Sequence, residues 1–320
     1  MGKRLVALAL VLSSAVACGP NMPPHAGPAA PTALPDGPIV VLGDTQRTFW
    51  GERMIGREQN EMPRRELIAK IAREEHPAFM VHLGDMVVTG DADEWRYFDR
   101  LMSPVTARKI RILPVLGNHD YWGDDRIALR HALRRFPELA ENGRYAGYHR
   151  GLGLIWLNSN LVGTAAREQA QWFGARLAAF DHDPSIRAVL VFSHHPPYTN
   201  GKQRQGKESE YIRSELLPSF DHARKTVAML SGHVHGYERF VIHERTFVVT
   251  GGAGGPRVEY EIGTDAHPEP AYVTRDGRPR AFNYVVVSDR GERLDFTVKC
   301  LAIDAVCSDG ILERFSVVLR

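Results

Sequence analysis

The stretch that decides the fold reads SGHVHGYERF, residues 231–240. Within it, His233 and His235 stand one residue apart, after a glycine and after an apolar run, 226–230, that predicts a strand. Two histidines on a turn can both point at one position, and imidazole is the commonest metal ligand among side chains near neutral pH. Histidine pairs at this spacing also occur in ordinary cores and surfaces. The metal hypothesis therefore depends on the rest of the chain.

Four other loops carry potential metal ligands in the same setting. They read Gly43-Asp44, Gly84-Asp85, Gly117-Asn118-His119-Asp120 and Ser193-His194-His195-Pro196-Pro197-Tyr198. Each follows a short apolar run that predicts a strand, and these runs cover 39–42, 79–83, 110–116 and 188–192. Open α/β sheets place their sites at the carboxyl ends of strands. One aspartate after a strand is usually a turn or cap residue, but five such loops in this order favour a shared site.

The remaining pattern predicts the fold class. Apolar residues at helical spacing predict helices over 62–74, 91–101, 124–136 and 165–180. After Gly232 the chain is strand-like with little helix, over 240–243, 246–250, 282–288, 294–300 and 313–319. The glycine-rich turn at 251–255 lacks the spacing of a phosphate-binding loop and is assigned to structure. An α/β part followed by a β-rich part predicts two packed mixed β-sheets flanked by helices.

The order of the loops resembles the calcineurin-like metallophosphoesterase superfamily, whose pattern is D-x-H, G-D, G-N-H-[DE], H and G-H-x-H. The resemblance spans roughly residues 39–247. The stretches VFSHHPPY and SGHVHGYER are most similar to the purple acid phosphatases within that superfamily. It implies an α/β/β/α sandwich. It also implies an acid-phosphatase-like phosphoric ester hydrolase, in which a dinuclear metal site and a metal-activated hydroxide hydrolyse phosphate monoesters.

The resemblance assigns a role to each ligand position. Asp85 would bridge two divalent ions, such as Mn, Fe or Zn. The first ion would be held by Asp44, Gln46 and His235, and the second by Asn118, His194 and His233.

Two positions depart from the family pattern. Gln46 stands where the family has histidine, so it would supply a weak amide-oxygen contact or none. Val88 stands where purple acid phosphatases place an iron-binding tyrosine, so no tyrosine-to-iron charge-transfer colour is expected.

The resemblance also implies the catalytic residues. His119 would face the leaving-group oxygen and donate a proton to it, or stabilise charge on the phosphoryl oxygens. Asp120 would orient His119, as carboxylates orient imidazole in many sites, or would only cap a turn. His195 would contact a ligand or the substrate. Four further loop residues are candidates for substrate phosphate or are simply solvated: Arg47, Tyr198, Lys202 and Arg204.

The first 17 residues predict export. Lys3 and Arg4 precede an apolar stretch, 5–16, that is too short to span a bilayer, and small residues follow it. Residues 1–17 are therefore expected to be a signal peptide. Cys18 directly after the small residues resembles a bacterial lipobox, and a plain secretory signal cleaved near Ala17 is the alternative.

These features define the expected domains and location. Residues 18–37 hold the lipobox Cys18 and a tether rich in proline and glycine, and 38–320 form the catalytic domain. The protein is expected in the periplasm or cell envelope, where the lipid on Cys18 would be its membrane contact.

Charge and cysteine content limit the partners. The chain has 40 basic and 38 acidic side chains, and removing residues 1–17 removes Lys3 and Arg4 and leaves an even balance. No nucleic-acid partner is expected, because such a surface needs a basic excess. The expected partner is a phosphorylated small-molecule substrate. Cys300 and Cys307 can form a disulfide in an oxidising compartment, and two reduced thiols are the alternative.

Three other functions stay open. The His-Pro stretch also resembles cyclic-nucleotide diesterases of the same superfamily, which favours a phosphodiester substrate. Gln46 motivates a non-catalytic surface lipoprotein on this scaffold, because a lost metal ligand can mark a decaying site. Hydrolysis of non-phosphate esters is supported only by the versatility of folds.

Overall fold

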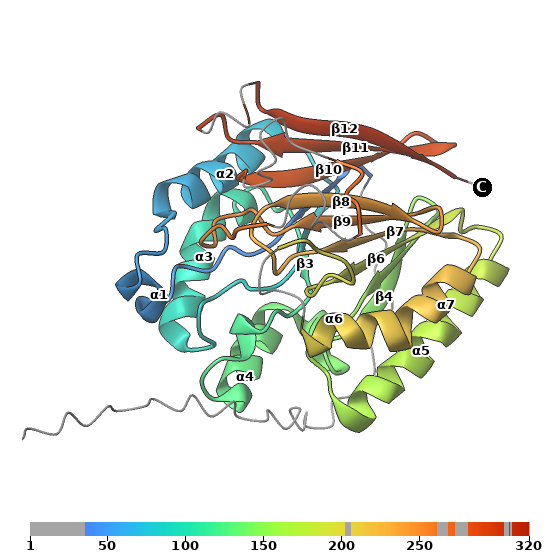
Figure 1. Ribbon diagram of the computed structural model, residues 1–320, viewed down its shortest axis with the longest axis horizontal. Helices are drawn as coiled ribbons and strands as arrows, with labels where there is room; N and C mark the ends of the chain where they lie inside the picture. Colours follow the sequence, from blue (N-terminus) through green and yellow to red (C-terminus); the bar gives the residue numbers. More distant parts are fainter. Residues whose placement is uncertain are drawn as a thin grey trace, which may run out of the picture.

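The computed structural model describes residues 36–201, 206–260, 268–272, 281–303, 307 and 309–319. Within these residues, two six-stranded β-sheets pack face to face, and helices cover both outer faces. Figure 1 shows α2 and α3 on one side of the molecule and α5 and α7 on the other. The predicted α/β/β/α sandwich is confirmed.

The first sheet is mixed. Its strands lie in the order β12 (Ile311–Val318), β11 (Arg293–Cys300), β10 (Asn283–Asp289), β1 (Ile39–Leu42), β2 (Phe79–His82) and β3 (Ile112–Pro114). Strands β1, β2 and β3 are parallel, and β10 pairs antiparallel with β1 to extend the sheet. The three parallel strands therefore end at one edge.

The second sheet has the same design. Its strands lie in the order β4 (Tyr145–His149), β5 (Leu152–Trp156), β6 (Ala188–Ser193), β7 (Thr226–Ser231), β9 (Arg245–Thr250) and β8 (Tyr237–Ile242). Four central strands, β5, β6, β7 and β9, are parallel, and β4 and β8 are antiparallel edge strands.

Helices lie between many of the strands along the chain. They are α1 (Trp50–Met54), α2 (Glu61–Glu74), α3 (Ala92–Thr106), α4 (Asp125–Arg135), α5 (Gly163–His182), α6 (Lys207–Tyr211) and α7 (Leu217–His222). Two 3₁₀ turns, η1 (His119–Tyr121) and η2 (Pro137–Ala140), and a π-helical turn, η3 (Ile212–Leu216), complete them. Asp91 and Asp124 cap α3 and α4 by accepting N–H groups of the first turn. The four helices expected from the sequence correspond to α2, α3, α4 and α5.

Alternation along the strands builds three apolar layers. In β1, Val40 and Leu42 pack against α2 and α3, whereas Ile39 and Val41 lie between the two sheets. In β6, Val189 and Val191 pack towards α5 and α7, and their neighbours face the first sheet. Because both faces of the strands are covered, their sequences are continuous apolar runs.

Strands β4 and β5 and helices α6 and α7 were not expected from the sequence. Strand β5 reads LGLIW, and glycine weakens a strand pattern. Gly153 lies directly under the ring of Phe180 in α5, where an added Cβ would come within 2.7 Å of a ring carbon. The glycine is therefore required by helix packing, which the sequence pattern does not reveal.

Three expectations remain to be compared with the structure: the disulfide, the N-terminal segment and the predicted loop residues Lys202 and Arg204. Cys300 and Cys307 form a disulfide, with their Cα atoms 6.1 Å apart, which confirms the predicted bridge. The signal peptide, Cys18 and nearly all of the tether lie outside the described residues, and so do Lys202 and Arg204. Within the described part of the chain, no helix combines the length and the apolar character that crossing a membrane requires.

Candidate metal centre and active site

The five loops named from the sequence meet at one place. Asp44, Asp85 and Asn118 follow β1, β2 and β3 of the first sheet, and His194 and His233 follow β6 and β7 of the second. Parallel strands direct their carboxyl ends to the same edge, and the two stacked sheets bring those edges together. The side chains lie within hydrogen-bonding distance of one another, as the contacts below show.

Three of these residues hold an unusual backbone conformation. Asp44, Asp85 and His233 have φ angles of 65°, 52° and 69°, in the left-handed region that non-glycine residues rarely adopt. The N–H of His233 donates to both carboxylate oxygens of Asp44, at 3.0 and 2.9 Å. The Asp44 N–H donates to the carbonyl of Gly84 at 3.0 Å. Such strain persists where surrounding contacts hold it, and it concentrates at functional sites.

One group of donor atoms surrounds Nε2 of His194. This atom lies 3.1 Å from Oδ1 of Asn118, 3.4 Å from Oδ1 of Asp85 and 3.2 Å from Nδ1 of His233. The carbonyl of Leu83 accepts a hydrogen bond from Nδ1 of His194 at 2.8 Å. A carbonyl can only accept, so Nδ1 carries a proton, and Nε2 can offer a lone pair to the group once its own proton is lost.

A second group of donor atoms surrounds Nε2 of His235. This atom lies 3.4 Å from Oδ1 of Asp44 and 3.1 Å from Nε2 of Gln46, and the latter lies 3.2 Å from Oδ2 of Asp85. Nδ1 of His235 donates to the carbonyl of Pro256 at 2.7 Å, which again leaves Nε2 with a lone pair. The two oxygens of Asp85 therefore face the two groups separately, so this one carboxylate could contact an ion in each group.

The Gln46 amide turns its nitrogen towards the centre. Its Oε1 is buried and has no hydrogen-bond partner among the described residues. An amide N–H cannot bind a cation, but a half-turn of the amide exchanges the nitrogen for the oxygen. Buried carboxylate, imidazole and amide-oxygen donors are a set that suits divalent ions of the zinc, manganese and iron type. The two groups of atoms thus fit divalent metal ions.

Charges in the centre are strongly coupled. Burial acts to raise the pKa of Asp85, but His194, His119 and His233 more than offset it and hold that pKa well below its usual range. Burial acts to lower the pKa of His194, but Asp85 raises it to about 9. Burial also raises the pKa of Asp44. Metal binding at His194 therefore competes with a proton, which makes metal affinity depend on pH.

Two glycines of the motifs leave room for these carboxylates. A Cβ on Gly117 would overlap Oδ1 and the backbone nitrogen of Asp85. A Cβ on Gly232 would lie 2.5 Å from Oδ2 of Asp44. Any larger residue would displace a candidate ligand.

His119 is oriented by a main-chain atom. Its Nδ1 donates to the carbonyl of Val88 at 3.0 Å, and its backbone N–H donates to Oδ1 of Asp85 at 2.9 Å. Among the described residues its Nε2 has no hydrogen-bond partner. Nothing in the sequence pattern pointed to Val88 for this role, because the contact uses a carbonyl that every residue has.

The prediction that Asp120 orients His119 is wrong. The Asp120 carboxylate accepts hydrogen bonds from the N–H groups of Met86, Val87 and Gly117, at 2.9, 3.2 and 2.9 Å. Asp120 thus joins the loops that follow β2 and β3, which is the turn-cap alternative. Burial and the charge of Asp85 raise the pKa of Asp120 to about 7, against the opposing effect of the Gly117 N–H.

His195 lies beside the ligands. Its ring centroid is 4.4 Å from that of His233, and its Nδ1 is 2.8 Å from the hydroxyl of Ser159. Burial lowers the pKa of His195 well below its usual value, so the ring is neutral. One nitrogen each of His194, His195 and His233 could also hold an ion together, since these atoms lie within 4.8 Å of one another. Ser159 carried no signal in the sequence.

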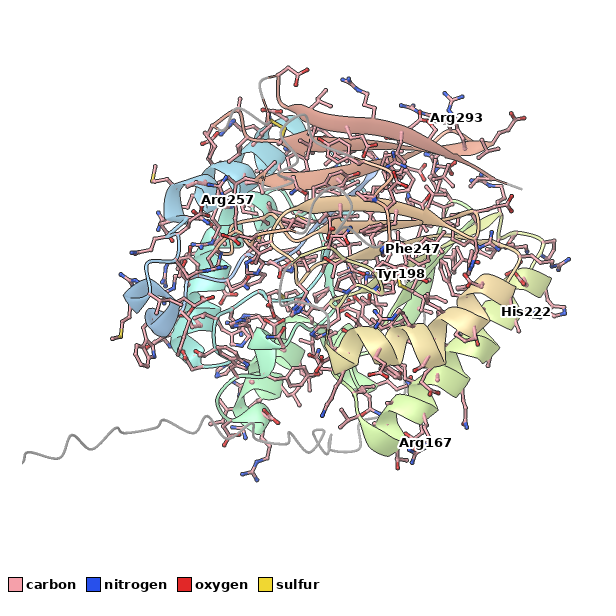
Figure 2. The ribbon with its side chains drawn as sticks, in the orientation of Figure 1. Arg167, Tyr198, His222, Phe247, Arg257 and Arg293 are labelled. Carbon is pink, nitrogen blue, oxygen red and sulfur yellow. A yellow bond between two sulfur atoms is a disulfide. The ribbon has the colours of Figure 1, made fainter. Side chains whose placement is uncertain are left out.

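Two candidate substrate contacts have other roles in the structure. The guanidinium of Arg47 is paired with Glu94 and lies 4.7 Å from the ring centroid of Tyr97. The ring of Tyr198 packs against the ring of Phe247, with their centroids 5.0 Å apart. Figure 2 labels these two residues next to each other.

Known proteins are similar to this chain in sequence. Purple acid phosphatase 22 of Arabidopsis thaliana is 24% identical over 234 residues, which are 70% of this chain and 49% of the relative. This chain thus spans about half the length of that relative. A probable cyclic nucleotide phosphodiesterase of Rhodopseudomonas palustris is 29% identical over 213 residues, 62% of this chain and 71% of the relative.

The fold is shared with a solved structure. The purple acid phosphatase from yellow lupin (Lupinus luteus) seeds superposes with a TM-score of 0.68 at 18% identity, over 88% of this chain and 53% of the other. The sequence pattern of the calcineurin-like phosphoesterases matches residues 37–237, a range that includes every loop from Asp44 to His235. This chain belongs to the calcineurin-like phosphoesterase family.

Proposed function

We propose that the protein is a metal-dependent phosphohydrolase that hydrolyses phosphate monoesters at a two-ion site. One observation carries the proposal: Asp85 turns one carboxylate oxygen to the group around His194 and the other to the group around His235. The similarity to purple acid phosphatase 22 supports the monoester.

The proposal gives each side chain a role. The first ion would be held by Asp44, His235 and, after a turn of its amide, Gln46; the second by Asn118, His194 and His233; and Asp85 would contact both. When bound, the ions would neutralise phosphoryl charge and make a water nucleophilic near neutral pH. Asn118 is a neutral ligand and adds no charge that repels an anionic substrate.

His119 supplies the proton in this proposal. The Val88 carbonyl accepts from Nδ1, which leaves Nε2 as the ring atom that can donate a proton to the leaving oxygen. The backbone contact to Asp85 keeps the ring beside the metal centre.

A phosphodiester is the second candidate substrate. The relative from Rhodopseudomonas palustris is named as a probable cyclic nucleotide phosphodiesterase, and this chain covers 71% of it. The two esters use the same ions and differ in the substituents on phosphorus.

Assays of the purified protein with an aryl phosphomonoester, a phosphodiester and a carboxylic ester test the proposal. Monoester hydrolysis should be fastest, should stop on chelation and should return when Mn²⁺ or Zn²⁺ is added back. Asp85→Asn should lose bound metal together with rate. Full activity in protein shown by elemental analysis to be free of metal would contradict the two-ion site. Metal-loaded protein that hydrolyses none of the three esters would instead support a non-catalytic role.

We also propose that the protein is exported and anchored through a lipid on Cys18, with 38–320 as the catalytic domain. The basic start, the short apolar stretch and the small residues before Cys18 support this. Mass spectrometry of the mature N-terminus from a bacterial host tests it. An unmodified terminus at Cys18 or beyond contradicts lipidation and leaves export standing.

A further inference from the structure

Three aromatic side chains form a continuous surface beside His119. The ring centroid of Trp122 lies 4.0 Å from that of His119, with 39° between the planes. The ring of Phe49 meets Trp122 edge-on at 5.7 Å and lies 5.2 Å from Trp50. We call Phe49, Trp50 and Trp122 the aromatic wall. It begins at the residue proposed to protonate the leaving group.

The loops that carry the wall are tied to the metal centre. The N–H of Phe49 donates to Oε2 of Glu52, which fixes the start of α1. Arg57, just after α1, donates to the Pro256 carbonyl at 2.9 Å, and the same carbonyl accepts from Nδ1 of His235. This contact fixes the segment that follows β1 against the loop beside His235.

The backbone of Trp122 is fixed by two hydrogen bonds. Its N–H donates to the carbonyl of His119 at 3.1 Å, and its carbonyl accepts from Gly90 at 2.8 Å. The backbone beneath the indole is therefore fixed relative to His119.

The aromatic wall is not part of the hydrophobic core. Trp50 is 66% exposed and Trp122 is 42% exposed, whereas Trp95 and Trp156 are fully buried. None of the three wall residues belongs to the apolar clusters formed by the described residues. Contiguous exposed apolar surface in a folded protein is typical of ligand-binding or interaction sites. The alcohol that leaves from phosphorus must lie next to His119, and the surface available there is aromatic.

We propose that the aromatic wall is the leaving-group subsite and that the preferred substrates are phosphate esters whose leaving alcohol carries a planar aromatic ring. This inference rests on the proposed phosphohydrolase function. Stacking of a planar ring on exposed aromatic side chains corresponds to about 5- to 150-fold in affinity. An aryl alcohol and a nucleoside share this chemistry.

Binding of non-hydrolysable ligands tests the subsite without turnover. Calorimetric titration of the metal-loaded protein with benzylphosphonate and with methylphosphonate should show at least about 5-fold tighter binding of the benzyl ligand. Trp122→Ala should lose most of this ratio and Trp122→Phe should keep it. Tyr148→Ala, at an exposed tyrosine of edge strand β4, is the matched control and should leave the ratio unchanged. Equal affinities of the two ligands for the unaltered protein would overturn the proposal.

Kinetics on matched esters test the aromatic preference. The leaving alcohols of 2-phenylethyl, 2-cyclohexylethyl and ethyl phosphate are chemically alike at the reacting oxygen. The phenylethyl ester should have the highest kcat/KM, and Trp122→Ala should reduce its advantage over the ethyl ester. Equal kcat/KM for the phenylethyl and cyclohexylethyl esters would show a merely apolar surface and overturn the aromatic assignment. A comparison of kcat/KM for adenosine 5′-monophosphate and ribose 5-phosphate shows whether a nucleoside, and not only an aryl alcohol, is a preferred leaving group.

The two experiments fail independently. Protein that prefers benzylphosphonate but hydrolyses no ester would contradict the proposed function and keep the aromatic subsite. Protein that hydrolyses all esters without distinction and binds both phosphonates equally would keep the function and contradict the subsite.

Discussion

Gln46 stands where the family pattern has histidine, and its amide lies between two candidate ligands. Its Nε2 is 3.2 Å from Asp85 and 3.1 Å from His235. An amide oxygen is a weaker donor than imidazole to borderline transition metals, so the first ion should bind more weakly than the second. Gln46→His should tighten first-ion binding by roughly 10–100-fold. Calorimetric metal titration measures this, and unchanged affinity would mean that residue 46 does not face the ion.

Substitutions of His119 and Asp85 should distinguish an effect on catalysis from an effect on metal binding. His119→Ala should keep the bound metal and lower the rate by roughly 10²–10⁴-fold, the range for loss of a general acid. The ring of His119 is held by Val88, and only its backbone N–H contacts Asp85. Asp85→Asn is the matched variant that should lose metal. Elemental analysis beside steady-state rates distinguishes the two, and metal loss in His119→Ala would make His119 a ligand.

At the scale of elements, Glu238 ties the loop after β6 to β8. Its carboxylate accepts the N–H of Asn200 at 2.8 Å and the hydroxyl of Thr199 at 2.5 Å. Burial raises the pKa of Glu238 from 4.5 to about 7, against these two hydrogen bonds. The protonated form is thus favoured in the folded state. Protonated Glu238 contributes roughly 3 kcal/mol to the free energy of unfolding. This contribution is present below about pH 4.5 and is lost as the pH rises through about 7.

Glu238→Gln, which cannot ionise, should therefore show a smaller fall in the free energy of unfolding between about pH 5 and 8 than the unaltered protein. Chemical denaturation at a series of pH values measures the difference. Glu215→Gln, at an exposed position, is the control and should follow the unaltered protein. A difference between Glu238→Gln and the unaltered protein that does not change with pH would contradict the assignment.

At the scale of the whole molecule, the candidate metal centre lies where the two sheets meet. Its candidate ligands come from the first sheet (Asp44, Asp85, Asn118) and from the second (His194, His233, His235). A ligand that binds only the folded chain stabilises it, by about 2.7 kcal/mol at 100 times its Kd. For a chain of this size this corresponds to roughly 4 °C in Tm, because the entropy of unfolding grows with chain length.

Chelation should therefore lower the Tm, and added metal should restore it. Scanning calorimetry with and without chelator measures the shift. Asp85→Asn should show little response to either treatment, because its shared ligand is altered. An unchanged Tm in the unaltered protein, with metal removal verified, would show that the ions do not hold the sheets together.

The sequence by itself determined the elements that carry the centre. Strands β1, β2, β3, β6 and β7 are short apolar runs broken by glycine or polar turns, and the candidate ligands stand at their ends. The helices α2 to α5 follow from apolar spacing, and α3 and α4 also from the aspartates that cap them. These signals are local, because side-chain alternation, helical spacing and capping involve residues a few positions apart.

Only the tertiary structure decided which atoms meet. The Val88 carbonyl orients His119, Asp120 joins two loops instead, and Gly153 makes room for Phe180. The aromatic wall likewise brings Phe49 to Trp122, from loops that follow different strands. Each is a contact between residues distant in sequence. Each depends on a carbonyl, an N–H group or a packing space that the residue type at one position does not predict. The packing of strands and helices places these atoms together, and a one-dimensional pattern does not contain that information.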